Sequence, residues 1–305
     1  MEYEKSNLEK TFESGQFAVT AEIGPPMSAD AENVRNKARE LKGVVHAANV
    51  TDNQTAIVRM SSVSAACLSQ EEGVECVVQM TMRDRNRIAM QSDLLGAWAL
   101  GLKNLLVLSG DHQSFGNHPQ SKNVFDVDSI QFLRAMTILQ KEGIFMSGSK
   151  CKFPPNFFLG ATTNPFADPE ELQLLRLEKK VNAGARFIQT QCIYDLERFD
   201  RFMDKVRERG LHERAYIQAG IFVNKSLKSI QMTQLVAGMD VPDEYVRRFE
   251  AAEDKQAEGI KVAVELIDYL KKVKGISGVH IMAVGWEEIV PEIVKLAGLF
   301  PAEMQ

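Results

Sequence analysis

The stretch that decides the fold is FAVTAEIGPP, residues Phe17 to Pro26. Small and apolar residues fill most of it until Glu22, and then Gly24 and two prolines stop the run. This pattern predicts a short buried strand over residues 17–23, because glycine and proline end regular structure. The strand carries a carboxylate, that of Glu22, at its carboxyl end.

Seven more runs of this kind follow along the chain. They cover residues 45–51, 74–82, 104–109, 156–163, 187–194, 216–223 and 278–284. Most are almost continuously apolar, which is typical of parallel strands that are covered on both faces. The sequence therefore predicts eight parallel strands.

The segments between these runs have the period and polarity of helices. In residues 169–183, for example, Leu174, Leu177 and Val181 share one face by their spacing, and Asp168 is expected to cap the helix. The longer stretch 224–277 holds two helical patterns. Eight β/α repeats without a linker predict an α/β fold, a (β/α)8 TIM barrel that forms a single domain over residues 1–305.

Composition excludes several classes of function. The chain has 305 residues, a net charge of −5 and no basic stripe with interleaved aromatic residues, so a nucleic-acid partner is not expected. Its four cysteines are dispersed, which fits reduced thiols better than disulfides or a zinc site. The amino terminus has no apolar signal region, and no apolar run approaches about 18 residues. We therefore expect a cytoplasmic protein without membrane insertion or metal.

In a TIM barrel the active site lies at the carboxyl ends of the strands. The polar residues at those predicted ends are Glu22, Thr51 to Asn53, Gln79 to Arg83, Ser109 to Asp111, Thr162 to Asn164, Gln189, Gln191 and Gln218 to Asn224. They comprise few acids, several amides and few basic groups. This composition favours a neutral heteroaromatic ligand that is bound by hydrogen bonds over a phosphorylated sugar.

Two acids at these ends are candidate catalytic groups. Glu22 has the position of a general acid or base, although a turn at the surface would also explain a carboxylate there. Asp111 ends the run LLVLSGD, and its alternative role is to cap a turn or a helix after Gly110. Two acids from different strands can serve opposed roles.

Charged groups near the mouth also allow two interpretations. The run MTMRDRNR at residues 80–87 could clamp an anion or form salt bridges at the rim, and the second explanation is the more ordinary. Lys179 and Lys180 could reach a ligand phosphate or simply end a helix. His112 and His118 give little support to a metal site. A barrel lyase with a Schiff-base lysine is disfavoured, because Lys103 precedes its strand.

An ordered set of motifs resembles a known family. The motifs are AEIGPP (21–26), NVT (49–51), LSGD (108–111), NPFADPE (164–170), LEKKVNAGARFIQTQ (177–191), AGI (219–221), VPDEYVRRFE (241–250) and HIMAV (280–284). Together they resemble the flavin-dependent methylenetetrahydrofolate reductases, which are (β/α)8 barrels. FDVDSI (125–130) and the arginine run resemble the branch of the family found in anaerobes and in fused reductases.

The resemblance implies reduction of 5,10-methylenetetrahydrofolate to 5-methyltetrahydrofolate by hydride transfer from a reduced flavin. It implies that Glu22 is the general acid and that Asp111 lies beside pterin and flavin. It also implies that Gln191 and Leu227 bind substrate. The cofactor-binding residues that it implies are Thr51, Gln79, Ser109, Gly110, Asp111, Thr162, Asn164, Asp168, Arg176, Lys179 and Lys180.

Some positions differ from familiar bacterial members of the family. Gln79, Ser109, Asn164 and Asp168 replace residues that hold the adenine half of FAD there, so the flavin is FAD by family while FMN stays open. Leu227 replaces a phenylalanine that stacks on nicotinamide. The electron donor is therefore NADH, NADPH or a partner subunit with an iron-sulfur or flavin relay, and we expect an oligomer or hetero-complex. A folate-binding subunit without catalysis is a further alternative.

Overall fold

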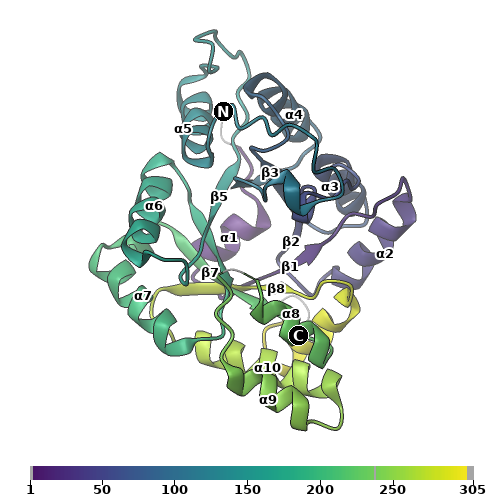
Figure 1. Ribbon diagram of the computed structural model, residues 1–305. Coiled ribbons are helices and arrows are strands. Elements are labelled where there is room, and N and C mark those ends of the chain that lie inside the picture. The colour runs from purple at the N-terminus through teal and green to yellow at the C-terminus, as the bar shows by residue number, and fades with distance from the viewer. Residues whose placement is uncertain (1–2, 237, 301–305) are drawn as a thin grey trace.

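Eight parallel strands form a closed barrel in chain order in the computed structural model, which describes residues 3–236 and 238–300 (Figure 1). The strands are Ala18–Ile23 (β1), Ala47–Val50 (β2), Cys76–Thr81 (β3), Asn104–Leu108 (β4), Phe158–Thr163 (β5), Phe187–Cys192 (β6), Tyr216–Phe222 (β7) and Ile276–Met282 (β8). β1 pairs with both β2 and β8, which closes the ring. The predicted TIM barrel and its eight strands are confirmed.

Helices surround the barrel, as Figure 1 shows. They are Asn7–Glu13 (α1), Ala31–Leu41 (α2), Ser62–Glu71 (α3), Arg87–Ala99 (α4), Ser129–Glu142 (α5), Glu170–Ala183 (α6), Leu196–Glu208 (α7), Leu227–Gln234 (α8), Asp243–Ala251 (α9), Lys255–Leu270 (α10) and Val290–Leu296 (α11). Short 3-10 turns at Gln54–Ala56 (η1), Gln113–Phe115 (η2), Leu211–Glu213 (η3) and Glu287–Ile289 (η4) join some of them. Among the helices described, none is long and apolar enough to cross a membrane.

Two details of the helix prediction were wrong. The stretch 224–277 holds three helices, α8, α9 and α10, instead of two. α6 begins at Glu170 with Pro169 at its N-cap, so Asp168 lies outside the helix and does not cap it. The reason is that proline fits the extended backbone of an N-cap, and it donates no N–H of its own.

The pleat of the strands separates two apolar cores. Along β1, Val19, Ala21 and Ile23 face outward and pack in the large core between strands and helices. Ala18 faces inward and belongs to a smaller core that also contains Leu8 and Phe12 of α1. α1 therefore closes one end of the barrel, where Figure 1 shows it across the ring of strands.

A buried polar layer lies between that closed end and the open mouth. Its members are the inward-facing residues Thr20, Asn49, Gln189, Gln218 and His280, all at most 3% exposed. They occupy the inward positions that follow the apolar ones along their strands, because side chains alternate between the two faces. The interior of the barrel thus changes from apolar at α1 to polar toward the mouth.

Candidate active site at the mouth of the barrel

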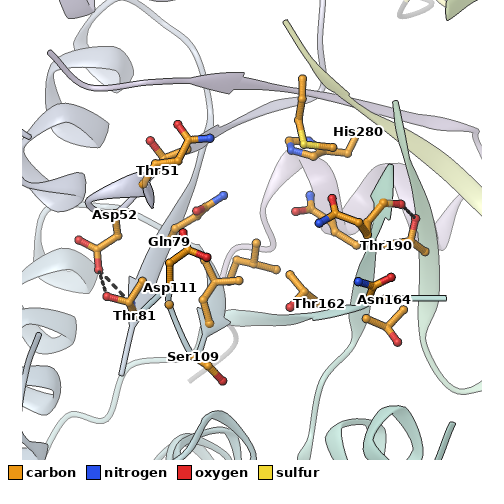
Figure 2. Close-up of a pocket in the computed structure, with 18 of the residues that line it drawn as sticks. Thr51, Asp52, Gln79, Thr81, Ser109, Asp111, Thr162, Asn164, Thr190 and His280 are labelled. Carbon is orange, nitrogen blue, oxygen red and sulfur yellow. Dashed lines mark hydrogen bonds between the residues drawn. The ribbon is translucent and has the colours of Figure 1, made fainter. Parts of the chain in front are cut away.

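A cavity of about 420 Å³ opens at the carboxyl ends of the strands. Most of the predicted site residues line it, namely Glu22, Thr51, Gln79, Ser109, Gly110, Asp111, Thr162, Asn164, Arg176, Lys180 and Gln191. Figure 2 shows them converging from separate strands, with Thr51 and Asp52 on one side and His280, Thr190 and Asn164 on the other. The fold brings these segments together because parallel strands of a barrel end at one face.

Glu22 is the buried acid of this cavity. Its side chain is 8% exposed, and its Oε1 accepts a hydrogen bond from Gln54 Nε2 at 3.2 Å. Its Oε2 lies 3.7 Å from Nε2 of His280. Glu22 has no lysine or arginine partner among the described residues. It is therefore a shielded carboxyl group that faces a ligand space, and not a carboxylate of a surface turn.

The other two acids of the cavity have different surroundings. Asp52 is buried, accepts from the N–H and hydroxyl of Thr81 and pairs with Arg85 at 2.7 Å (Figure 2). Asp111 is exposed at the rim, where its Oδ2 accepts from the Thr55 N–H at 3.1 Å. Asp111 does not cap a helix, because the residue at the N-cap of η2 is His112. It is an ionisable group at the entrance.

The arginine run forms salt bridges at the rim. Arg83 pairs with Asp84 at 2.7 Å, and Arg87 pairs with Asp126 at the same distance. Arg85 joins Asp52 to Asp93. Each guanidinium is already neutralised by a carboxylate, so the more ordinary of the two interpretations describes this run.

Two positively charged side chains, Lys180 and Arg176, lie on the α6 side of the cavity. Lys180 is buried, donates to the Thr162 carbonyl at 2.5 Å and forms no ion pair among the described residues. Burial, and then the nearby Arg176 guanidinium, lower the pKa of Lys180 to about 8. Arg176 also lines the cavity without an ion-pair partner in the described chain. Two uncompensated cations at one wall suit an anionic group of a ligand.

The opposite wall offers polar groups and a close backbone approach. Thr51 Oγ1 is buried and has no hydrogen-bond partner among the described residues, so it is available to a polar ligand edge. Gly110 has a φ of +85°, and a Cβ there would lie 3.0 Å from Cβ of Thr81. Glycine is favoured at this turn because any other residue would be strained at this φ and its Cβ would make a tight contact with Thr81 at the end of β3.

Three predicted site residues lie outside the cavity wall. Asp168 is exposed and pairs with Arg198 at 2.8 Å. Lys179 points to solvent from the outer face of α6, and Leu227 packs at the start of α8 against the outer core. Their proposed contacts with cofactor or substrate are therefore not supported by position.

Sequence reasoning missed two groups beside Glu22. His280 lines the cavity from β8, and Gln54 reaches it from η1. His280 was quoted only within the motif HIMAV. His280 lies two residues after Gly278 and two before Met282, so the three residues point to the same face of the strand. This alternation was the signal that could have identified it. Gln54 carried no such signal, because it lies in an irregular turn after β2.

Other reactive side chains of the described chain contribute little to the chemistry of this cavity. Lys103 pairs with Glu4 at 2.8 Å, away from the cavity. Burial raises the pKa of the Cys192 thiol, which therefore stays protonated and is a poor nucleophile. Within residues 3–236 and 238–300, no three His, Cys, Asp or Glu side chains gather where they could hold a metal ion.

Several curated proteins are similar to this chain. A 5,10-methylenetetrahydrofolate reductase of Pectobacterium carotovorum is 22% identical over 299 residues, which cover 94% of this chain and 92% of that protein. The Salmonella typhimurium reductase of the same name is 23% identical over 94% of this chain and 93% of its own. A probable methylenetetrahydrofolate reductase (NADPH) of Caenorhabditis elegans is 25% identical over 250 residues, and the chain spans only 36% of that longer protein.

Solved structures share the fold. A protein from Clostridium thermocellum, described as binding two copies of 5-methyl-5,6,7,8-tetrahydrofolic acid, has a TM-score of 0.65 over 96% of this chain and 98% of its own, at 14% identity. An F420-dependent secondary alcohol dehydrogenase has a TM-score of 0.57 over 92% of this chain and 99% of its own, at 11% identity. At such low identity these likenesses establish the barrel alone.

The wider comparison settles the family. The sequence profile of the family described as methylenetetrahydrofolate reductase matches residues 7–298, nearly the whole chain. The ordered motifs quoted above lie within that range, and all of them except AGI (219–221) and VPDEYVRRFE (241–250) contribute residues to the cavity. The chain belongs to the methylenetetrahydrofolate reductase family.

Proposed function

We propose that this protein reduces 5,10-methylenetetrahydrofolate to 5-methyltetrahydrofolate, with Glu22 as the general acid. The observation that carries the proposal is a buried carboxyl group at the wall of a cavity rich in amides and hydroxyls, with no lysine or arginine partner in the part of the chain that the structure describes. Family membership supports the reaction. The folate described in the Clostridium thermocellum neighbour supports the class of ligand.

The proposed chemistry begins with a proton from Glu22. It is transferred to N10 of the folate, the bond between N10 and the methylene carbon breaks, and the electron pair stays on N10. The carbon is left as an iminium on N5, and Asp111 at the rim is suited to stabilise that positive charge. Gln191 and its neighbours are proposed to orient the pterin by amide hydrogen bonds.

The residues of the cavity fit a flavin as the proposed cofactor. Thr51 and the Ser109–Gly110 turn would bind polar atoms of its ring, and Arg176 with Lys180 would bind its phosphate. Gln79, Thr162 and Asn164 complete this wall. When bound and reduced, a flavin supplies hydride to the methylene carbon. FAD and FMN both fit this proposal.

The decisive experiment is anaerobic reoxidation of the photoreduced, flavin-loaded protein by methylenetetrahydrofolate in a stopped-flow instrument. We expect wild type to be reoxidised with formation of 5-methyltetrahydrofolate. Glu22→Gln should keep the flavin spectrum but slow reoxidation by at least about two orders of magnitude, the lower range for loss of a general acid. Wild type that binds no flavin, or that folate does not reoxidise, would refute the proposed reaction.

Glu287→Gln is a matched control for the loss of a carboxylate. Glu287 lies in a small cavity next to Glu22 but pairs with Lys37 at 2.9 Å and does not line the main cavity. We expect this variant to lose some stability and to be reoxidised at nearly the wild-type rate. Equal losses in both variants would show that the rate depends on folding and not on the acid.

The same instrument identifies the electron donor. Reduction of the flavin by NADH or NADPH alone would make a nicotinamide the donor. A flavin that dithionite reduces, but neither nucleotide does, would favour electron supply by a partner subunit. Binding of folate without any reoxidation of the reduced flavin would leave the non-catalytic alternative.

A further inference from the structure

A continuous chain of hydrogen bonds crosses the buried interior of the barrel and ends beside Glu22. Asn49 and Gln189 exchange two amide bonds of 2.7 and 3.2 Å. Gln189 Nε2 also donates to Gln218 Oε1 at 3.1 Å, and Gln218 Nε2 donates to Thr20 Oγ1 at 3.2 Å. Thr20 Oγ1 is 2.9 Å from Nδ1 of His280.

The amide groups give this chain one direction. Asn49 and Gln189 satisfy each other in either joint orientation, so the direction of the chain is set at its other end, by Gln218. Gln218 receives a bond on its oxygen, and its nitrogen faces Thr20 and the Val279 carbonyl. The Val279 carbonyl, 3.4 Å away, can only accept, and it would face an oxygen if the Gln218 amide were reversed. The Thr20 oxygen therefore accepts from Gln218.

The direction at Thr20 fixes the proton on His280. The Thr20 oxygen accepts from Gln218, and the acceptor that its hydroxyl hydrogen meets among the described residues is His280 Nδ1, so the hydroxyl donates to that nitrogen. A neutral imidazole that accepts at one nitrogen carries its proton on the other, here Nε2. Nε2 is the atom that lies 3.7 Å from Glu22 Oε2, and a shift of less than about 1 Å would bring the two to hydrogen-bonding distance.

We propose that His280 is a positioning residue for Glu22, held by the Thr20–Gln218–Gln189 chain as the Nε2–H tautomer with its proton aimed at the carboxylate. The inference deepens the proposed function and rests on it for the role of Glu22. His280 and Thr20 are 3% and 0% exposed, so water does not compete for these bonds. The N–H of His280 would hold the acid in place and stabilise the carboxylate that remains after proton transfer.

Nitrogen NMR of the protein labelled with ¹⁵N-histidine tests the tautomer directly. The chain has five histidines. His46 supplies an internal reference, because its Nδ1 accepts from the Val19 N–H at 3.0 Å and it must therefore be Nε2–H if neutral. We expect the same pattern for His280. An Nδ1–H tautomer, or an imidazolium at neutral pH, would overturn the proposal.

Two variants of Thr20 test the hydrogen-bond chain without changing the histidine. Thr20→Val keeps the shape of the side chain but removes the hydroxyl, and we expect the His280 signals to show a mixture of tautomers. Thr20→Ser keeps the hydroxyl and should retain Nε2–H. If Thr20→Val also retains a single Nε2–H tautomer, the hydroxyl does not set the proton and this part of the proposal is wrong.

Kinetics test whether His280 acts through Glu22. Asparagine places its amide near the position of Nδ1, whereas glutamine places it near Nε2. His280→Asn should slow folate-dependent reoxidation by roughly tenfold, the effect of one hydrogen bond to a charged group, with little change in the half-saturating folate concentration. His280→Gln should recover most of that loss. Equal rates in His280→Asn and wild type would refute a positioning role.

A double variant separates this proposal from the proposed reaction. In the Glu22→Gln background, His280→Asn should cause no further slowing, because the group that it positions is gone. An additive tenfold loss would mean that His280 acts elsewhere. If wild type itself is not reoxidised by folate, the proposed function fails, and the tautomer measurements still decide whether the chain of bonds orients His280.

Discussion

Lys179 and Lys180 are adjacent in sequence but lie in opposite environments. Lys179 is exposed, whereas Lys180 is 9% exposed and faces the cavity together with Arg176, one helical turn earlier. The sequence made both lysines candidates for binding a ligand phosphate but did not show which of them faces the cavity. The spacing could have done so, because Lys180 follows the buried Leu177 by three positions and Arg176 by four, which places the three on neighbouring faces of α6.

We expect Lys180→Met to stabilise the cofactor-free protein. An unpaired buried ammonium is unfavourable, so at pH 7 its removal should raise the free energy of unfolding by about 1–3 kcal/mol. Between about pH 8 and the ordinary lysine value of 10.5, the unfolded wild-type chain binds more protons at this residue than the folded chain does. Wild type should therefore gain stability as the pH rises through that window, and Lys180→Met should lack this gain.

Urea unfolding of flavin-free protein at several pH values measures this difference. Lys179→Met is the control, because an exposed lysine should change stability by no more than about 0.5 kcal/mol. Flavin affinity should fall in Lys180→Met and not in Lys179→Met. A Lys180→Met protein that is less stable than wild type at pH 7 would contradict the account of Lys180 as an unfavourably buried cation.

Three acids at the mouth show what sequence could and could not predict at this scale. The predicted strand ends identified Glu22, Asp52 and Asp111 as neighbours, and the cavity contains all three. Their different environments depend on partners far away in the chain. Asp52 is neutralised by Arg85, and Glu22 meets His280 of the last strand. No local pattern encodes such pairings, so the sequence could not separate a structural acid from a shielded one.

At the scale of elements, α8 is tied to the barrel by a buried polar cluster around Asn224. Asn224 Oδ1 accepts from the hydroxyls of Ser229 and Thr233 at 2.7 and 3.0 Å, and its Nδ2 donates to Tyr194 at 2.7 Å. The Tyr194 hydroxyl in turn donates to the Phe222 carbonyl at 2.9 Å. The cluster links the end of β7 to the first two turns of α8.

We expect Asn224→Ala to loosen α8 selectively. The change removes the three hydrogen bonds that Asn224 makes to Tyr194, Ser229 and Thr233, which should lower the free energy of unfolding by about 2–3 kcal/mol. Hydrogen exchange should speed up most at the amides of residues 227–234, because this cluster is their main polar anchor. Ser229→Ala, which removes one bond, should have a smaller effect on the same amides. Unchanged exchange in α8 would refute the anchoring role.

The region of α8 also marks the limit of the prediction of elements. The strands, and the one helix whose bounds were predicted, α6, match the structure to within a few residues, because their patterns are long enough to be distinct. α8 has only 8 residues, too few for helical periodicity to be distinguished from a turn, so two patterns were predicted where three helices form. The Val241–Pro242 step could have indicated where a separate helix begins, since Pro242 is the N-cap of α9.

At the scale of the whole molecule, eight repeats of strand and helix were enough to predict the barrel. Its interior was harder to predict. Almost continuous apolar runs predicted strands that are covered on both faces. In the structure, the inward face of five of these strands carries the polar layer, which ends beside Glu22. The role of the amino-terminal helix α1 in closing the barrel was not predicted, although Leu8 and Phe12 belong to the inner core.

Phe12 of α1 makes the aromatic contacts that tie this closing helix to the barrel. Its ring stacks on Tyr216 with centroids 4.7 Å apart and also packs on Phe158 and Phe187, so one side chain joins α1 to three strands. Phe12→Ala should lower the free energy of unfolding by about 3–5 kcal/mol, because it leaves a cavity in the inner core. Phe115→Ala is the control, since that ring is 72% exposed on η2 and its loss should change the free energy of unfolding little.

Urea unfolding, followed by far-UV circular dichroism and by intrinsic fluorescence, measures both variants. If α1 is part of the cooperative unit, the two signals should shift together to a lower midpoint in Phe12→Ala. A wild-type midpoint in that variant would mean that the barrel is stable without its closing helix.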